Sequence, residues 1–155
     1  KQIKNEQPIT ITDPNMTRFM MSLQDAIDLV LFAFRNARQG DLFVRKSPAC
    51  TVGNLAQALK NIFASNVDIK NIGIRHGEKV CETLATIDEL CRAEDMGDYF
   101  RVGIDDRDLN YNKYFTEGEN NNKMVTDYTS MNTNQLSVSE IEQLLIDLPE
   151  VKSEL

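Results

Sequence analysis

Residues 9–15, Ile-Thr-Ile-Thr-Asp-Pro-Asn, set the organisation of the chain. The two isoleucines alternate with threonines, which is typical of a short strand with one buried face, and Asp-Pro-Asn then ends the strand as a turn. A helix follows. Ser22 and Asp25 have the spacing of a helix-capping pair, apolar residues recur at intervals of three and four, and Gly40 lies just past the end. A strand that leads into an amphipathic helix indicates an α/β or mixed α+β fold.

Strands and helices continue to alternate as far as residue 104. The patterns predict further strands at residues 42–44, 67–74 and 99–102, and helices at residues 51–63 and 86–92. The continuous apolar run Leu-Phe-Val at residues 42–44 predicts a buried strand. Connections of this length carry a helix across a parallel sheet. We therefore expect a small, partly parallel sheet with flanking helices.

The chain changes character after residue 104. Residues 105–134 are polar and rich in asparagine, so we expect an irregular, partly mobile segment. Ser137 and Glu140 have the spacing of a capping box and open a last helix. Its apolar side must pack on the chain's own core or on a neighbouring subunit. That side consists of Ile141, Leu144, Leu145 and Leu148. The expected organisation is an α/β subdomain at residues 1–104 and a polar tail with a C-terminal helix at residues 105–155.

Composition excludes several classes of function. The 155 residues carry 17 Lys and Arg against 24 Asp and Glu, a net charge of −7, which argues against nucleic-acid binding. No apolar run is long enough to span a membrane, and the first residues lack the apolar core of a signal peptide. The three cysteines and the single histidine, His76, are too scattered for a zinc site, so we expect no metal. Reduced thiols of this kind suit a cytoplasmic protein.

The glycines do not form a nucleotide-binding loop. No two of the seven are separated by a single residue, so the G-x-G-x-x-G loop of dinucleotide-binding folds is absent. The sequence Gly-Ile-Arg-His-Gly-Glu-Lys at residues 73–79 has neither the length nor the Ser/Thr of a phosphate-binding P-loop. We therefore expect no cofactor in this chain, and no ATP or dinucleotide binding through either device.

Two polar segments leave predicted strands at their carboxyl ends, where ligands bind in open α/β sheets. They are residues 13–19 and residues 74–79. Arg75 offers a planar donor fork that suits a phosphate, and Glu78 can accept from a ribose hydroxyl or orient Arg75. The alternative interpretation is a charged surface turn. His76 lacks an evident orienting partner, so its assignment as a general base is weaker, and we assign no catalytic residue.

The same segments resemble a known family. Residues 8–22, 40–46 and 72–79 closely resemble the C-terminal half of bacterial UDP-N-acetylglucosamine 4,6-dehydratases and 5-epimerases, capsular polysaccharide synthesis proteins within the extended short-chain dehydrogenase/reductases. Residues 105–115 and 127–133 resemble later motifs of the capsule branch, although Met131 stands where that branch typically has histidine. The resemblance implies that this chain is the substrate-binding half and that the Rossmann half, with its NADP site and catalytic residues, is absent.

The resemblance also implies site residues. The turn after the first strand matches the place where the family holds the nucleotide, which makes Asn15, Met16 and Arg18 candidates for substrate binding. The Ile-Arg-x-Gly-Glu-Lys turn matches a diphosphate and ribose contact, which makes Arg75 and Glu78 candidates.

The function expected from this resemblance is UDP-sugar binding within a dehydratase/epimerase of capsule or O-antigen synthesis. The expected partners are the UDP-sugar, the missing Rossmann half and further copies in a homo-oligomer, and the isolated chain is expected to be inactive. Two alternatives remain open. The parent is a UDP-sugar 4-epimerase or reductase of the same superfamily, or the chain is a non-catalytic nucleotide-binding or oligomerisation module.

Overall fold

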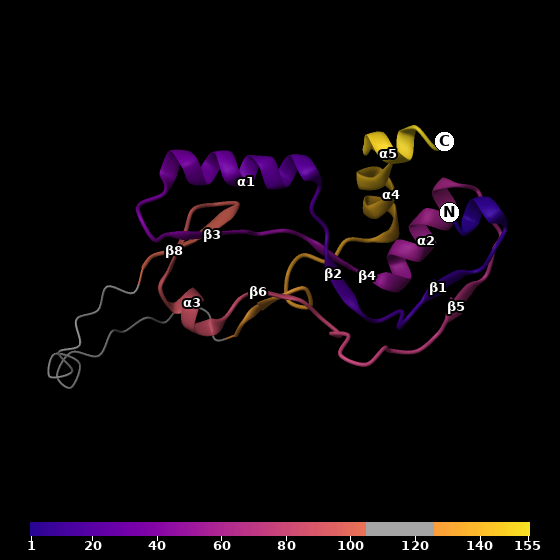
Figure 1. The fold of residues 1–155 in the computed structure, drawn as a ribbon, viewed down its shortest axis with the longest axis horizontal. Helices are drawn as coiled ribbons and strands as arrows, with labels where there is room; N and C mark the ends of the chain where they lie inside the picture. Colours follow the sequence, from indigo (N-terminus) through magenta and orange to yellow (C-terminus); the bar gives the residue numbers. More distant parts are fainter. Residues whose placement is uncertain (105–125) are drawn as a thin grey trace, which may run out of the picture. The chain divides into compact units, whose positions relative to one another are not determined.

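The structure is a computed structural model that describes residues 1–104 and 126–155 (Figure 1). These residues belong to two compact units, each built from separate parts of the sequence. Unit 1 comprises Lys1–Ser22, Ser47–Glu82 and Thr129–Leu155, and unit 2 comprises Leu23–Lys46 and Thr83–Tyr128. The α/β class is confirmed. The expected boundary at residue 104 does not coincide with this division, because unit 1 combines N-terminal and C-terminal segments.

Unit 1 is built on a parallel pair of strands covered by a helix. Its elements are η1 (Ile3–Asn5), β1 (Ile9–Ile11), β2 (Thr17–Phe19), β4 (Ala49–Thr51), α2 (Val52–Ile62), β5 (Ile69–Asn71), α4 (Val138–Ile146) and α5 (Pro149–Lys152). β1 pairs with β5 in parallel, with Ile9 opposite Ile69, and β2 pairs with β4 in antiparallel. The alternation predicted for β1 is confirmed, since Ile9 and Ile11 are buried beside Ala56 of α2.

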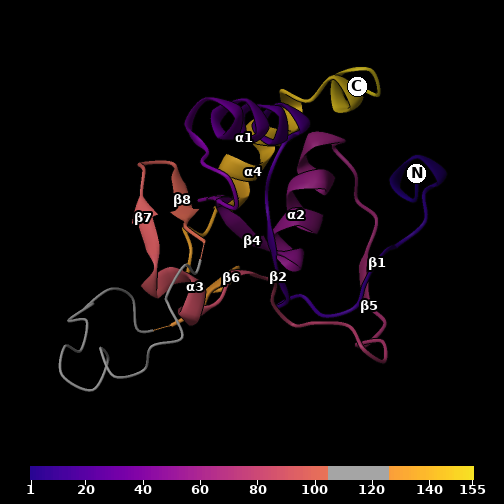
Figure 2. The ribbon, with the colours of Figure 1, turned by 60° about the vertical axis from the view of Figure 1, so that its left-hand side comes forward.

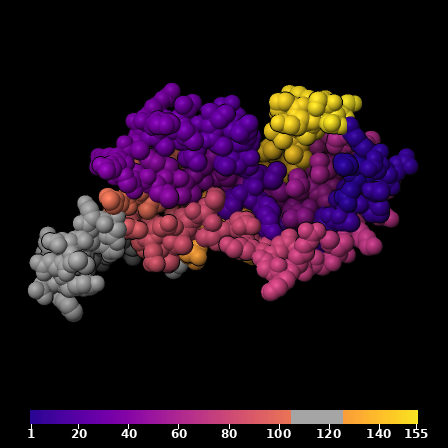
Figure 3. All heavy atoms as spheres, in the orientation of Figure 1, coloured from indigo at the N-terminus to yellow at the C-terminus, as the bar shows by residue number. Residues whose placement is uncertain are grey.

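The C-terminal helix packs on the core of unit 1. α4 lies against α2 (Figure 2), with Ile141 and Leu145 buried against Cys50 and Ala58. The predicted capping box is present. Of the two docking alternatives, the structure shows packing on the chain's own core. The C-terminal residues also lie beside the N-terminal residues (Figure 3), where Lys4 forms an ion pair with Glu154.

Residues 126–134 were expected to be irregular and partly mobile; they form one two-residue strand, Tyr128–Thr129, but hydrogen bonds hold the segment in place. Ser130 is completely buried, and its backbone N–H donates to Glu82 O at 2.8 Å. Its hydroxyl accepts from Glu82 N at 2.9 Å and lies 2.7 Å from Thr17 Oγ1. Thr133 Oγ1 donates to Ser47 O at 2.9 Å. Hydrogen bonds from short hydroxyl side chains thus hold this polar segment in place, and a low content of apolar residues does not reveal them. The expectation for residues 105–125 lies outside the described residues.

Unit 2 is a helix packed on an antiparallel sheet. Its elements are α1 (Leu23–Asn36), β3 (Leu42–Arg45), β6 (Thr83–Ala85), α3 (Ile87–Cys91), β7 (Ala93–Asp95) and β8 (Tyr99–Val102), and β6 pairs with β9 (Tyr128–Thr129). The sheet has the order β3-β8-β7. Phe32 of α1 stacks on Tyr99 with ring centroids 4.2 Å apart and meets the Phe43 ring edge-on at 5.7 Å.

The expectation for residues 42–44 is corrected in two respects. β3 pairs in antiparallel with β8, with Val44 opposite Phe100, and is not a strand of the parallel pair. Only Val44 is buried, while Leu42 is about half exposed, so the strand is buried on one face and not on both. A three-residue apolar run is too short for its periodicity to distinguish these cases. Among the described residues, no helix has the length and apolar character needed to cross a membrane.

Candidate functional site

The two polar segments predicted from the sequence lie together in unit 1. β1 and β5 run parallel, so their carboxyl ends meet at one edge, and Ile72 N donates to Ile11 O at 2.8 Å just beyond the ladder. The turn after β1 and the loop after β5 both begin there. Thr12 Oγ1 joins them by donating to Glu78 Oε1 at 3.2 Å. The expected juxtaposition of the segments is therefore present.

Arg18 holds the loop after β5 in place. Its guanidinium donates to Lys79 O at 2.9 Å and, more weakly, to Val80 O at 3.4 Å. It also lies 3.9 Å from the Glu78 carboxylate and 3.8 Å from that of Glu82. The side chain is about 29% exposed, so these contacts are partly shielded from water. In this arrangement the donors of Arg18 already serve the protein, and its predicted contact with a ligand stays a prediction.

Glu78 closes the tip of the loop. Glu78 Oε2 accepts from Arg75 N at 3.2 Å, and Glu78 N donates to Arg75 O at 3.1 Å. The intervening Gly77 has φ +78°, a left-handed conformation that side chains with a Cβ rarely adopt. The carboxylate thus binds Thr12, Arg18 and the backbone of Arg75 together. This favours the proposed role of orienting Arg75 over that of a free acceptor for ribose.

Arg75 is an exposed cation of the site, as is Lys79 on the same loop. Its backbone is fixed by Glu78, whereas its guanidinium makes no ion pair with the described residues. A planar donor fork in this situation suits a phosphate or diphosphate, which accepts two parallel hydrogen bonds. Asn15 is also exposed, on a turn fixed by a bond of 2.8 Å from Asn15 N to Asp13 Oδ1. Both side chains are therefore available to a ligand.

Met16 has a supporting position. It is completely buried, and its sulfur accepts from Thr12 Oγ1 at 3.4 Å and from Arg18 Nη2 at 3.6 Å. These weak contacts place it behind the two residues that organise the loop. Direct contact between Met16 and a nucleotide stays a prediction.

The amino end of α2 is occupied by the protein itself. Val52 N donates to Met16 O at 2.8 Å, and Gly53 N donates to Pro14 O at 3.0 Å. Asn54 N is used by the Thr51 cap at 3.1 Å. A side chain at position 53 would place its Cβ 3.1 Å from Pro14, so glycine allows this close approach. The first three amides of α2 are therefore already bonded within the protein, and the contact of Arg75 with a phosphate stays a prediction.

The remaining groups with possible chemistry are His76 and the cysteines. His76 is exposed on the same turn, and we assign it no catalytic function. The cysteines in the described parts form no disulfide, and burial raises the pKa of the Cys50 thiol, which makes it unreactive. No group of three or more potential metal ligands occurs within residues 1–104 and 126–155.

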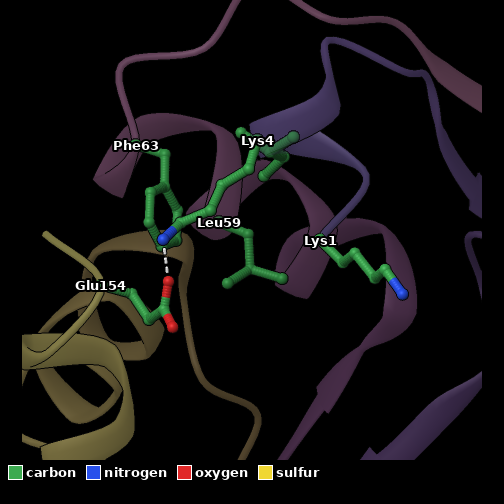
Figure 4. A pocket seen from close by; sticks show the side chains of 6 residues that line it. Lys1, Lys4, Leu59, Phe63 and Glu154 are labelled. Atoms are coloured by element: carbon green, nitrogen blue, oxygen red, sulfur yellow. Dashed lines mark hydrogen bonds and ion pairs between the residues drawn. The ribbon is translucent and has the colours of Figure 1, made fainter.

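A separate pocket lies at the opposite end of the β1–β5 pair. It has a volume of about 330 Å³ and is lined by residues before β1, by the last part of α2 and by Glu154 (Figure 4). The Lys4 ammonium there is paired with Glu154, and Leu59 and Phe63 supply the apolar wall. The exposed Arg75 is not among its lining residues, so we do not assign the nucleotide to this pocket.

The sequence analysis missed the residues that support the site. Thr12, Glu82 and Ser130 all bond to Arg18, Glu78 or their neighbours. Thr12 continues the alternation of β1 and could have been found from it, because it points to the same side as Thr10. Ser130 comes from a segment more than a hundred residues away from Thr17, and local pattern carries no signal for such a contact.

Comparison with known proteins places the chain in a family. Residues 1–103 match the family model described as polysaccharide biosynthesis protein, and residues 105–152 match polysaccharide biosynthesis protein C-terminal. The chain belongs to the polysaccharide biosynthesis protein family.

Members of this family and a solved structure show the extent of the similarity. A protein from Rickettsia canadensis named UDP-glucose 4-epimerase is 53% identical over 154 residues, 99% of this chain and 45% of that protein. A protein of the same name from Rickettsia felis is 51% identical, again over 99% of this chain and 45% of that protein. The X-ray structure of Pen from Bacillus thuringiensis matches with a TM-score of 0.76 and 31% identity over 94% of this chain and 42% of that chain. The chain thus spans less than half the length of these polysaccharide biosynthesis proteins.

Proposed function

We propose that this chain is the substrate-binding part of an enzyme that epimerises or dehydrates UDP-sugars. The observation that carries the proposal is Arg75, an exposed guanidinium on a turn that Glu78 and Arg18 hold in one conformation. A preformed cation at the carboxyl ends of parallel strands suits the diphosphate of a nucleotide-sugar. The names of the Rickettsia relatives support the same substrate class.

In this proposal the residues of the site have different roles in binding the nucleotide-sugar. Arg75 binds the diphosphate, Glu78 holds the Arg75 backbone, and Arg18 fixes the remainder of the loop through Lys79 and Val80. Asn15 is placed to contact the nucleoside from the neighbouring turn. Because these groups are held before the ligand arrives, little conformational entropy is lost on binding.

The leading reaction is that of a UDP-N-acetylglucosamine 4,6-dehydratase/5-epimerase in capsule or O-antigen synthesis. It is supported by the resemblance at residues 8–22, 40–46 and 72–79. The second candidate is UDP-glucose 4-epimerisation, which the names of the relatives favour. The two reactions are separable by mass, since dehydration removes one water and epimerisation at C4 leaves the mass unchanged.

The cofactor belongs to the part of the parent enzyme outside this chain. The chain has no glycine-rich dinucleotide loop, and the first amides of α2 are bonded to Met16, Pro14 and Thr51. The residues present therefore do not fit a dinucleotide. We assign NADP to the missing Rossmann half, and no step of the chemistry is derived from this chain.

Calorimetric titration of the full-length parent with UDP-N-acetylglucosamine and with UDP-glucose tests the binding proposal. Arg75→Ala should raise the Kd of the preferred sugar nucleotide about ten- to a hundredfold, the effect of losing roughly 1.5–3 kcal/mol from a charged hydrogen-bonding pair. Arg75→Lys should recover part of the affinity. Arg38→Ala removes another exposed arginine, whose backbone rather than side chain bonds Asp41, and serves as the control. An unchanged Kd in Arg75→Ala would identify Arg75 as a surface charge.

Mass spectrometry of the products then distinguishes the two reactions. Incubation of the parent with UDP-N-acetylglucosamine should yield a product lighter by one water. A product of unchanged mass from UDP-glucose would favour the 4-epimerase instead.

A further inference from the structure

The most apolar side of helix α1 faces away from the sheet on which the helix packs. No residue of α1 is buried. Phe34 is 84% exposed and Leu23 is 76% exposed, and Ile27, Val30 and Leu31 are each roughly half exposed. We call these five residues the outer stripe. Scattered exposed apolar residues are common on proteins, but five large ones on a single helix are a contiguous apolar surface.

The helical geometry shows that the outer stripe is a separate face. At 100° per residue, Leu23, Ile27, Val30 and Phe34 fall within an arc of about 60°, Leu31 extends it to about 100°, and Phe32 lies on the opposite side. That opposite side is the one in contact with the sheet: Phe32 packs on Tyr99 and Phe43, and Asp25 forms an ion pair with Arg45 at 2.8 Å. Unit 2 therefore uses one side of α1 for its own packing and leaves the outer stripe uncovered.

The outer stripe has the residue spacing of a packed helix face, in addition to the Phe32 side that packs on the sheet. Leu23, Ile27, Val30 and Phe34 follow one another at intervals of four, three and four residues. Apolar residues with this spacing are typical of a helix face that packs against another element. A helix that required only one partner would have its large apolar residues on the Phe32 side. The sequence of α1 thus specifies a second partner.

We infer that the outer stripe of α1 is the docking surface for the half of the parent polypeptide that this chain lacks. The chain spans 45% of the relatives it matches over 99% of its own length, so more than half of such a protein remains to be placed. Because residues 105–152 match the C-terminal family model, that half precedes residue 1 in the parent. It is present at one copy per α1 and is tethered to it, which favours it over a partner that must be recruited from solution.

Thiol labelling tests the inference without placing a charge in the stripe. Phe34→Cys should react with a maleimide at the rate of an exposed thiol in this chain, and should be protected more than tenfold in the full-length parent. Asn36→Cys is the matched control: Asn36 is exposed on α1 and lies more than about 100° around the helix from every residue of the outer stripe, so a cysteine there should react equally in both proteins. Mass spectrometry of the peptides separates the new thiol from the native cysteines.

Dilution identifies the occupant. Protection by the tethered half is independent of protein concentration, whereas protection by a second copy is lost on dilution. Equal labelling of position 34 in the chain and in the parent would overturn the inference, and so would protection that disappears on dilution. The readout involves no UDP-sugar, so its failure is distinct from failure of the proposed function.

Discussion

Arg18 and Arg75 illustrate how two arginines of one site can have different functions. Arg18 is partly buried, and its donors are directed at three backbone carbonyls and two carboxylates. Arg75 is exposed, and its backbone alone is held. The family resemblance made both candidates, but the sequence could not separate them, since the distinction lies in contacts between segments about sixty residues apart.

The first prediction concerns Arg18. Arg18→Ala should loosen the loop of residues 75–82, because Glu78 and Glu82 lose their nearest cation and two carbonyls lose a donor. Hydrogen exchange of the amides in this loop should become faster, while exchange in α2 and α4 should stay as in the wild type. Arg35→Ala on α1 provides the control.

A double-mutant cycle then tests whether Arg18 acts through Arg75. If Arg18 positions the loop, the effects of Arg18→Ala and Arg75→Ala on the Kd for UDP-sugar should not be additive. Strict additivity would mean that Arg18 contributes to binding independently of Arg75, as a direct ligand contact would.

At the level of elements, capping signals and apolar periodicity predicted the helices well. The capping boxes at Thr86 and Glu89 and at Ser137 and Glu140 are both formed. The alternation of β1 was found, but other strands of two or three residues, among them β2, β4 and β9, were missed because so short a run seldom shows its periodicity. The local sequence also did not predict which strands pair, because pairing depends on tertiary contacts. β3, for example, pairs with β8.

The second prediction concerns the packing of α4. Ile141 is completely buried between α4 and α2, so Ile141→Ala should lower the free energy of unfolding by about 2–5 kcal/mol through lost burial and the resulting cavity. Ile146 lies on the same helix but is 41% exposed, so Ile146→Ala should cost much less. Urea denaturation measures both. Equal effects would indicate that α4 does not pack on α2 in solution.

The third prediction uses the pH dependence of the α4 cap. Hydrogen bonds from the Ser137 hydroxyl and backbone N–H hold the pKa of Glu140 below its ordinary value. A carboxyl with a lowered pKa in the folded state stabilises that state above the ordinary pKa of about 4.3, and this contribution is lost as pH falls through the folded pKa. The melting temperature of Glu140→Gln should therefore be lower than that of the wild type at pH 7, with the gap closing towards pH 3. Glu150→Gln on the neighbouring α5 should show no such convergence.

At the scale of the whole molecule, the order of elements in the sequence does not give their grouping in space. The chain leaves unit 1 after Ser22, returns at Ser47, leaves again after Glu82 and returns at Thr129. The boundary expected at residue 104 follows the polar stretch in the composition and stays a prediction, because composition carries no signal for these crossings. Family resemblance predicted the substrate class more directly than any local pattern, because it depends on several motifs in a fixed order.

The last prediction is that the isolated 155-residue chain binds but does not transform a UDP-sugar. Oxidation and reduction at a sugar carbon need a hydride carrier, and the chain lacks the glycine-rich loop that would hold one. What it retains is the Arg75 turn, whose conformation depends on contacts within unit 1 alone. Incubation with NADP and UDP-N-acetylglucosamine or UDP-glucose should therefore give no product by mass spectrometry, whereas the full-length parent under the same conditions should turn over one of the two. Affinity in the isolated chain should be weaker than in the parent, because only one side of the binding site is present. Product formation by the isolated chain would show that it carries a catalytic centre of its own and would overturn its assignment as a substrate-binding part.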